Sequence, residues 1–234
     1  MRHSKQTWSV IIFCFNEVGT VHNVTREAID VLGMMSNDFE VIVVDDGSTD
    51  GSSDEIDLAA QHEKVTAIHH PNNLGIGEAL RSGYQQASME NVVAIAADGE
   101  FKMDELLPHA LMESNTFVSF YRKVNTTYSS YRDMLSIVNR KLNKWLLNMD
   151  LKDVNWSNIY KTADVKSLNL ELTSSLVESE ICAKLIKKGV KPVESPSTYL
   201  ERVSGKSKGG SMKIVWQAVQ DIFKLIAVVT RYNP

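Results

Sequence analysis

The fold of this chain is decided by the stretch Val41-Ile42-Val43-Val44-Asp45-Asp46-Gly47-Ser48-Thr49-Asp50, in which four apolar residues are followed at once by polar ones. A similar apolar run, Val10-Ile11-Ile12-Phe13-Cys14-Phe15, lies upstream and also ends in polar residues. Short continuous apolar runs are typical of strands that are buried on both faces, as in a parallel sheet. The two runs therefore favour an α/β fold.

Helices and strands alternate along the first hundred residues. Apolar residues recur at helical spacing over 21–32 and 76–87, and further strand-like runs lie at 65–69 and 92–96. Such a series gives a mostly parallel central sheet flanked by helices, with ligands bound beyond the carboxyl ends of the strands. The sequence thus predicts a Rossmann-like α/β domain whose site lies among the residues that follow the strands.

The second half is expected to extend this domain. A strand near 117–121 and a long helix near 128–147 are followed by shorter elements, and an amphipathic helix begins at about Met212. We expect one α/β domain over 1–210 and a C-terminal helix over 211–234.

Composition narrows the class of protein. The 234 residues are 43% hydrophobic and 23% charged, and a net charge of -4 argues against nucleic acid as a partner. The two cysteines, Cys14 and Cys182, show no metal-ligand spacing and favour a reducing compartment. The first residues do not resemble a signal peptide, and no apolar stretch reaches the roughly 18 residues that span a bilayer. These features predict a cytoplasmic protein, either soluble or peripheral at the cytoplasmic face of a membrane.

The polar residues after the second strand admit two interpretations. Asp45 or Asp46 can accept hydrogen bonds from a nucleobase N–H or from ribose hydroxyls. Alternatively, the stretch is a tight turn that caps the next helix, since Ser, Thr and Asp favour caps.

The ordered set of motifs resembles the inverting family 2 glycosyltransferases of the GT-A fold. The set consists of Ser9–Glu17, Val43–Asp50, Asn73-Leu74-Gly75-Ile76-Gly77 and Ala97-Asp98-Gly99-Glu100-Phe101. The resemblance implies a nucleotide-sugar donor, and Phe13 stands where the family usually has proline. The implied donor-binding residues are Phe15, Asn16, Glu17, Asp45, Asp46, Gly75, Ala97 and Asp98.

The second half resembles dolichyl-phosphate mannose synthase and its polyprenyl-phosphate glycosyltransferase relatives. The matching stretches are Phe120–Arg122, the helix with Arg132 and Ser136, Val177–Ile181, Gly189–Pro196 and Tyr199–Lys208. By this resemblance, Arg122, Arg132 and Ser136 bind the acceptor phosphate. Arg132 and Ser136 lie four residues apart and share one helix stripe, where they can hold a phosphate or, alternatively, face solvent.

A basic, glycine-containing stretch follows Leu200. Arg202, Lys206 and Lys208 can order over a diphosphate and neutralise the departing nucleotide, although the same composition suits a solvated linker. We expect Asp98, Arg202 and Lys208 to carry the reaction.

The metal motif of the family is altered here. The family usually has two aspartates separated by one residue, and the first position is Ala96 in this chain. Glu100 restores a carboxylate, so we expect Asp98 and Glu100 to bind Mg²⁺ or Mn²⁺ together with the donor phosphates.

The expected reaction is transfer of a sugar from a GDP- or UDP-sugar to a polyprenyl phosphate with inversion. Two alternatives stay open: transfer to a hydroxyl of a sugar or small molecule, and a catalytically silent subunit that binds nucleotide sugars. The C-terminal helix likewise suits either core packing or a membrane interface.

Overall fold

The computed structural model describes residues 6–123, 144, 149–200 and 212–234, and the side chains of 212–220 are not among those described. The described strands form a seven-stranded sheet in the order β3-β2-β1-β4-β6-β5-β7. The pairs β1–β2, β1–β4, β2–β3 and β5–β7 are parallel, which confirms the predicted mostly parallel sheet, and β6 runs antiparallel to both of its neighbours. The strands are β1 (Trp8–Cys14), β2 (Phe39–Asp45), β3 (Val65–His69), β4 (Asn91–Ala96), β5 (Thr116–Arg122), β6 (Asn158–Lys161) and β7 (Lys191–Ser197).

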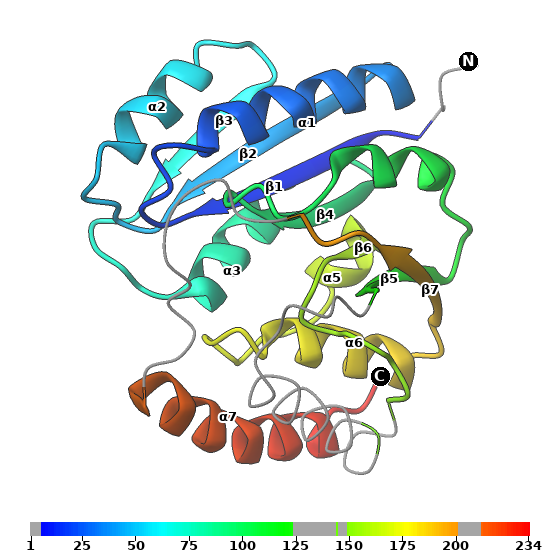
Figure 1. The fold of residues 1–234 in the computed structure, drawn as a ribbon. Coiled ribbons are helices and arrows are strands. Elements are labelled where there is room, and N and C mark those ends of the chain that lie inside the picture. The colour runs from blue at the N-terminus through cyan, green and yellow to red at the C-terminus, as the bar shows by residue number, and fades with distance from the viewer. Residues whose placement is uncertain (1–5, 124–143, 145–148, 201–211) are drawn as a thin grey trace.

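Helices cover both faces of the sheet (Figure 1). Successive strand residues point to opposite faces, so Val41 and Val43 enter the core under α1 while Ile42 and Val44 enter the core under α3 and α6. The predicted continuous apolar runs are thus confirmed as strands buried on both sides. The helices are α1 (Val21–Met35), α2 (Ser52–Ala59), α3 (Ile76–Gln86), the 3-10 helix η1 (Met103–His109), α5 (Thr162–Lys166), α6 (Val177–Lys187) and α7 (Met212–Arg231).

The core beneath α6 contains a buried carboxyl group. Glu178 accepts hydrogen bonds from the hydroxyls of Tyr84 and Tyr160, at 2.6 and 2.7 Å, and from the Asn158 amide at 2.9 Å. Burial raises the pKa of Glu178 above its ordinary value of 4.5, although these hydrogen bonds oppose the shift.

The C-terminal half of α7 packs against the domain. Leu225, Val228 and Val229 are buried, and Lys187 donates hydrogen bonds from Nζ to the carbonyl oxygens of Val229 and Tyr232 at 2.8 and 3.0 Å. Phe223, on the same helix, is 71% exposed. Of the helices in the described part of the chain, none is both long and apolar enough to cross a bilayer.

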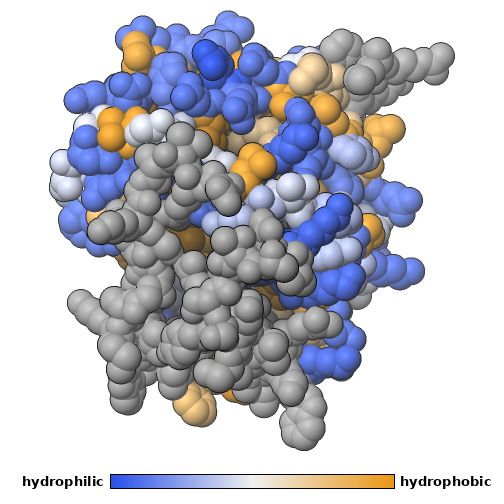
Figure 2. All heavy atoms as spheres, viewed as in Figure 1, coloured by the Kyte–Doolittle hydropathy of each residue, from blue (hydrophilic) through white to orange (hydrophobic). Residues whose placement is uncertain are grey.

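The visible surface over α1 and α2 is mostly hydrophilic (Figure 2). This agrees with helix α1, which buries one apolar face on the sheet through residues such as Val24, Ala28 and Leu32 and turns its polar residues outward.

Candidate functional site

The carboxyl ends of three parallel strands bring the predicted donor-binding residues together. In the sheet register Cys14 pairs with Asp45, and Phe13 pairs with Ala96. The residues that follow these positions therefore lie side by side at the same edge of the sheet. The Ala97 N–H, for example, donates to the Phe13 carbonyl at 3.0 Å. Phe15, Asn16, Glu17, Asp45, Asp46, Ala97 and Asp98 all lie at this edge, as predicted.

Asn16 ties the β1 loop to the β2 loop. Its backbone is left-handed, with φ 57°, a conformation that asparagine tolerates better than most residues. The Asn16 N–H donates to Ser48 Oγ at 3.0 Å, and Asn16 Oδ1 accepts from the Thr49 N–H at 2.7 Å. Next to it, the Glu17 N–H donates to Ser52 Oγ at 2.9 Å. The two loops therefore form one rigid rim.

Asp45 is buried at the end of β2 and accepts several hydrogen bonds from the protein. Oδ1 accepts from the Ser48 N–H at 2.9 Å, and Oδ2 accepts from Ser53 Oγ at 2.6 Å. His69 Nδ1 lies 3.1 Å from the same Oδ2. Burial raises the pKa of Asp45, but the hydrogen bonds from Ser48, Ser53 and His69 outweigh burial and hold the pKa below its ordinary value. Asp45 is therefore an anion in the folded protein.

His69 lies between two carboxylates. Its Nδ1 faces Asp45, and its Nε2 lies 3.1 Å from Oδ1 of Asp57. Burial lowers the pKa of His69, but the hydrogen bonds and charges of Asp45 and Asp57 outweigh burial and raise the pKa above its ordinary value. A neutral imidazole carries one N–H, so only the protonated ring can donate to both carboxylates. The sequence alone did not indicate this role of His69, because its partners come from β2 and α2.

Asp46 stabilises the entry to α3. Its Oδ1 accepts from the Leu74 N–H at 2.9 Å, and its Oδ2 accepts from the Gly75 N–H at 2.8 Å. His70 Nδ1 adds a third contact at 2.8 Å. Asp46 thus holds the Gly75 loop in place before α3, and it does not cap α2, the helix that follows it in the sequence.

Two glycines let the α3 loop approach its neighbours. Gly47 has φ +71°, and a Cβ there would overlap the backbone of Asn72. A Cβ at Gly77 would overlap the backbone of Thr173. The predicted strand-to-helix turn at Asn73–Gly77 therefore depends on close backbone packing.

Asp46, His70 and Ser82 form a row of hydrogen bonds like that of a serine hydrolase. His70 Nε2 lies 2.9 Å from Ser82 Oγ, and the His70 side chain is only 8% exposed. Ser82 lies inside α3, where backbone N–H groups already bond to carbonyls of the preceding turn and cannot stabilise an oxyanion. The row therefore fixes α3 on the loop and is not a hydrolytic site.

The Asp98–Glu100 turn is joined to the segment that precedes the basic stretch. Asp98 Oδ1 accepts from the Glu100 N–H at 3.1 Å, and Glu100 Oε1 accepts from the Tyr199 hydroxyl at 2.9 Å. The Leu200 N–H also donates to the Glu100 carbonyl at 3.0 Å. Residues 199 and 200 are thus anchored beside the two carboxylates.

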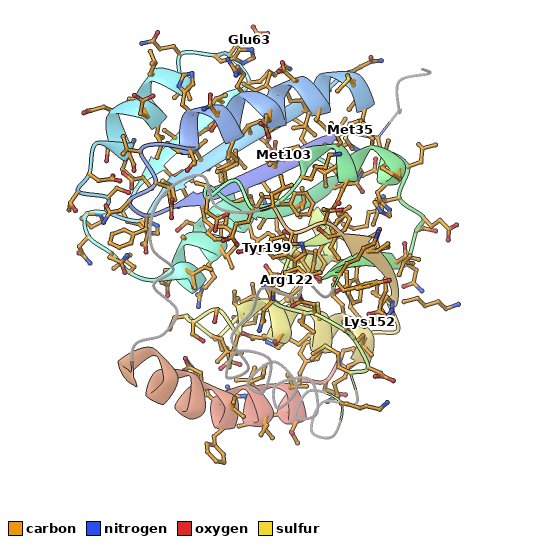
Figure 3. All side chains as sticks on the ribbon, in the orientation of Figure 1. Met35, Glu63, Met103, Arg122, Lys152 and Tyr199 are labelled. Atoms are coloured by element: carbon orange, nitrogen blue, oxygen red, sulfur yellow. The ribbon has the colours of Figure 1, made fainter. Side chains whose placement is uncertain are left out.

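Arg122 is connected to Tyr199 through the ring of Trp156, and Figure 3 shows Arg122 and Tyr199 close together. Its Nε and Nη2 donate to Asp153 at 2.7 and 3.2 Å, and its guanidinium lies 4.9 Å from the Trp156 ring centroid. The Trp156 ring also lies 6.0 Å from the Tyr199 ring and 6.1 Å from Phe101. The sequence alone did not indicate Asp153 and Trp156, because their loop has no periodicity and their partners are distant in sequence.

Several predicted residues lie outside the described part of the chain, namely Arg132, Ser136, Arg202, Lys206 and Lys208. Within the described residues, no group of three or more His, Cys, Asp or Glu side chains is arranged to hold a metal ion. Asp98 and Glu100 supply two carboxylates in a single turn, and oxygen is the ligand type that Mg²⁺ and Mn²⁺ prefer. This pair fits a cation that takes its remaining ligands from a diphosphate and water.

The chain is similar in sequence to known glycosyltransferases. Residues 9–158 match the family model described as glycosyl transferase family 2. An undecaprenyl-phosphate mannosyltransferase of Micrococcus luteus is 26% identical over 198 residues, which cover 78% of this chain and 80% of that protein. An undecaprenyl-phosphate 4-deoxy-4-formamido-L-arabinose transferase of Edwardsiella ictaluri is 25% identical over 213 residues, covering 88% of this chain but only 64% of that protein.

A solved structure shares the fold. The mannosyltransferase of Pyrobaculum calidifontis, in complex with GDP-Man and Mn²⁺, superposes with a TM-score of 0.68 and 20% identity, over 98% of this chain and 66% of that one. This likeness extends through both halves of the sheet and confirms the predicted GT-A type of α/β fold.

Proposed function

The chain belongs to glycosyl transferase family 2, and we propose that it transfers a sugar from a nucleotide sugar to a polyprenyl phosphate, with inversion at the anomeric carbon. The observation that carries the proposal is the convergence of Asp45, the Asp98–Glu100 turn and Arg122 along the carboxyl edge of the sheet. The Micrococcus relative, an undecaprenyl-phosphate mannosyltransferase, supports the acceptor class.

In this proposal the donor lies across the strand ends. The nucleoside faces the rim made by Asn16 and Asp45, and the diphosphate faces Asp98 and Glu100. These two carboxylates would hold Mg²⁺ or Mn²⁺, and the bound cation would supply charge neutralisation for the leaving diphosphate. Arg202 follows the anchored Leu200 by two residues and would act on the same charge, with Lys208.

Arg122 is proposed to orient the acceptor phosphate. A guanidinium fixed by Asp153 and stacked on Trp156 is preorganised, so it loses little side-chain entropy when it binds an anion. Arg132 and Ser136 complete the proposed acceptor site. A phosphate oxygen is already anionic near neutral pH, so the attack needs positioning and charge neutralisation more than a strong general base.

A polyprenyl phosphate resides in a bilayer, so we further propose a peripheral position at the cytoplasmic membrane face. Helix α7 is the proposed contact, because its described half keeps Phe223 exposed while Leu225, Val228 and Val229 are buried against the domain.

The test is a transfer assay with purified protein, a panel of UDP- and GDP-sugars, a polyprenyl phosphate and Mn²⁺. We expect glycolipid and nucleoside diphosphate to form in equal amounts. Release of nucleoside diphosphate only with a soluble hydroxyl acceptor would support the alternative acceptor class. Donor binding without turnover would support the silent subunit instead.

A matched pair of variants examines the acceptor site. Arg122→Lys keeps the charge but loses the planar fork, and we expect it to raise the KM for polyprenyl phosphate about tenfold or more while donor affinity stays unchanged. The control is Arg81→Lys, which changes an arginine of α3 that lies 3.9 Å from Glu78. It should leave the KM for polyprenyl phosphate and the donor affinity near their wild-type values. An unchanged KM in Arg122→Lys would remove Arg122 from the acceptor site.

A further inference from the structure

A buried ion pair on α6 has no role in the reaction as proposed above. Glu180 and Lys184 are 0% and 2% exposed, and Lys184 Nζ donates to Glu180 Oε1. Removing two charges from water is costly, so a buried pair needs further hydrogen bonds from its surroundings. Here these hydrogen bonds come from the loop between α5 and α6.

The pair binds three peptide groups of this loop. The Glu171 N–H donates to both oxygens of Glu180, at 3.0 Å to Oε1 and 3.1 Å to Oε2. The Leu172 N–H donates to Oε2 at 2.9 Å, and Lys184 Nζ donates to the Asn169 carbonyl oxygen. Hydrogen bonds to a charged group are roughly twice as strong as neutral ones. The pair therefore fixes the backbone of the loop on α6.

The same loop contacts the start of α3. Gly77 is the second residue of α3, and a Cβ at this position would overlap the backbone of Thr173 and Ser174. The two backbones can approach so closely because glycine has no side chain. The position of the loop therefore sets the position of the first turn of α3.

The entry to α3 lies in turn against the end of β2. The Leu74 and Gly75 N–H groups donate to Asp46, and a Cβ on Gly47 would overlap the backbone of Asn72. Asp46 and Gly47 directly follow β2, at the edge of the sheet where the donor is proposed to bind. A shift in the first turn of α3 would therefore displace the loop beside the donor.

We propose that Glu180 and Lys184 are positioning residues for donor binding, which act through the α5–α6 loop on the first turn of α3. This inference rests on the proposed function, in which the donor lies across the strand ends. Both residues are buried on α6, so they act without touching the donor. They hold the rim of the site in its binding conformation, which lowers the conformational cost of binding.

Two double variants test the hold on the loop. Glu180→Gln with Lys184→Met keeps an amide oxygen that can accept from the Leu172 N–H, whereas Glu180→Leu with Lys184→Met removes the acceptor. Uncharged replacements of a buried pair are often neutral for stability, so both variants are expected to fold. Calorimetry with UDP and with GDP, each in the presence of Mn²⁺, measures the donor side. We expect the Leu variant to bind nucleotide about tenfold more weakly than wild type, and the Gln variant to stay within about threefold of it.

The KM for polyprenyl phosphate separates positioning from a general loss of structure. It should stay near wild type in both double variants, whereas partial unfolding would raise it together with the nucleotide Kd. Nucleotide binding by the Leu variant as tight as that of the Gln variant would overturn the proposal. Failure of the wild type to bind either UDP or GDP would instead refute the proposed function.

A milder pair of variants tests the loop without changing the core. Thr173 and Ser175 are both exposed, but only Thr173 lies against Gly77. Thr173→Gly gives the backbone at this contact more freedom, so we expect it to weaken nucleotide binding severalfold. Ser175→Gly is the matched control and should bind nucleotide as the wild type does. Equal nucleotide affinities in Thr173→Gly and Ser175→Gly would contradict a role for this contact in donor binding.

Discussion

Replacing Asp46 by asparagine should destabilise the protein far more than its conservative appearance suggests. The Asp46 side chain is 5% exposed and accepts from two backbone N–H groups and from His70, all within 2.9 Å. Asparagine turns one oxygen into an NH₂ group, which leaves a buried N–H facing another donor and removes the negative charge from the remaining contacts. The combined cost is about 2–4 kcal/mol, from one unsatisfied buried donor and weaker charge-assisted bonds.

Thermal unfolding measures this cost. For a chain of this size, each kcal/mol shifts the Tm by roughly 2–4 °C, so Asp46→Asn should lower the Tm by about 4–16 °C. Asp30→Asn is the control, because Asp30 is exposed on α1 and should change stability by no more than about 0.5 kcal/mol. A Tm for Asp46→Asn within about 2 °C of wild type would refute this structural role of Asp46.

Three further predictions concern the metal, the membrane and pH. Asp98→Asn and Glu100→Gln should each weaken Mn²⁺ binding about tenfold or more in the presence of nucleoside diphosphate, as measured by titration calorimetry. Full activity in EDTA would contradict a role for the cation. Phe223→Glu should reduce binding to anionic liposomes in a co-sedimentation assay. The Tm should stay unchanged, because the Phe223 side chain is 71% exposed. Unaltered sedimentation would exclude this face of α7 as the membrane contact. Burial raises the pKa of Glu178, so this side chain binds its proton more tightly in the folded than in the unfolded protein. The free energy of unfolding of the wild type, relative to Glu178→Gln, should therefore fall as pH rises above 4.5 through the raised pKa. Urea unfolding at about pH 5 and about pH 8 measures this difference, and a relative stability that rises with pH would contradict the prediction.

The sheet was predictable because its strands are short apolar runs whose burial on both faces is visible in the sequence. Val41–Val44 shows this burial directly, and the parallel pairing of β1 with β2 follows from the alternation with helices. The antiparallel strand β6, Asn158–Lys161, was not predicted. It has four residues and no distinctive pattern, so its place between β4 and β5 is set by tertiary packing.

The site was predictable as an edge of the sheet but not as a set of contacts. Asp45 and Asp46 are adjacent and chemically identical, and the sequence gives no reason to assign them different roles. The structure separates them through β3 and the loop that follows it. Leu74 and Gly75 of the loop donate to Asp46, whereas His69, the last residue of β3, contacts Asp45. Such pairings span more than twenty residues and arise only when the loop is folded.

The two halves of the proposed reaction are connected through Glu100. Its side chain accepts from Tyr199, whose ring lies beside Trp156, and Trp156 in turn stacks under Arg122. Glu100 of the altered metal motif therefore binds a tyrosine of the segment that leads to the basic stretch. Since Glu100 contacts Tyr199 directly, a cation that drew the carboxylate toward a donor diphosphate would also change the position of Tyr199. Donor binding and the arrangement of the acceptor side are thus expected to be coupled in this chain through one hydrogen bond. The coupling is absent if Tyr199→Phe leaves the affinity for polyprenyl phosphate equally responsive to added nucleoside diphosphate and Mn²⁺.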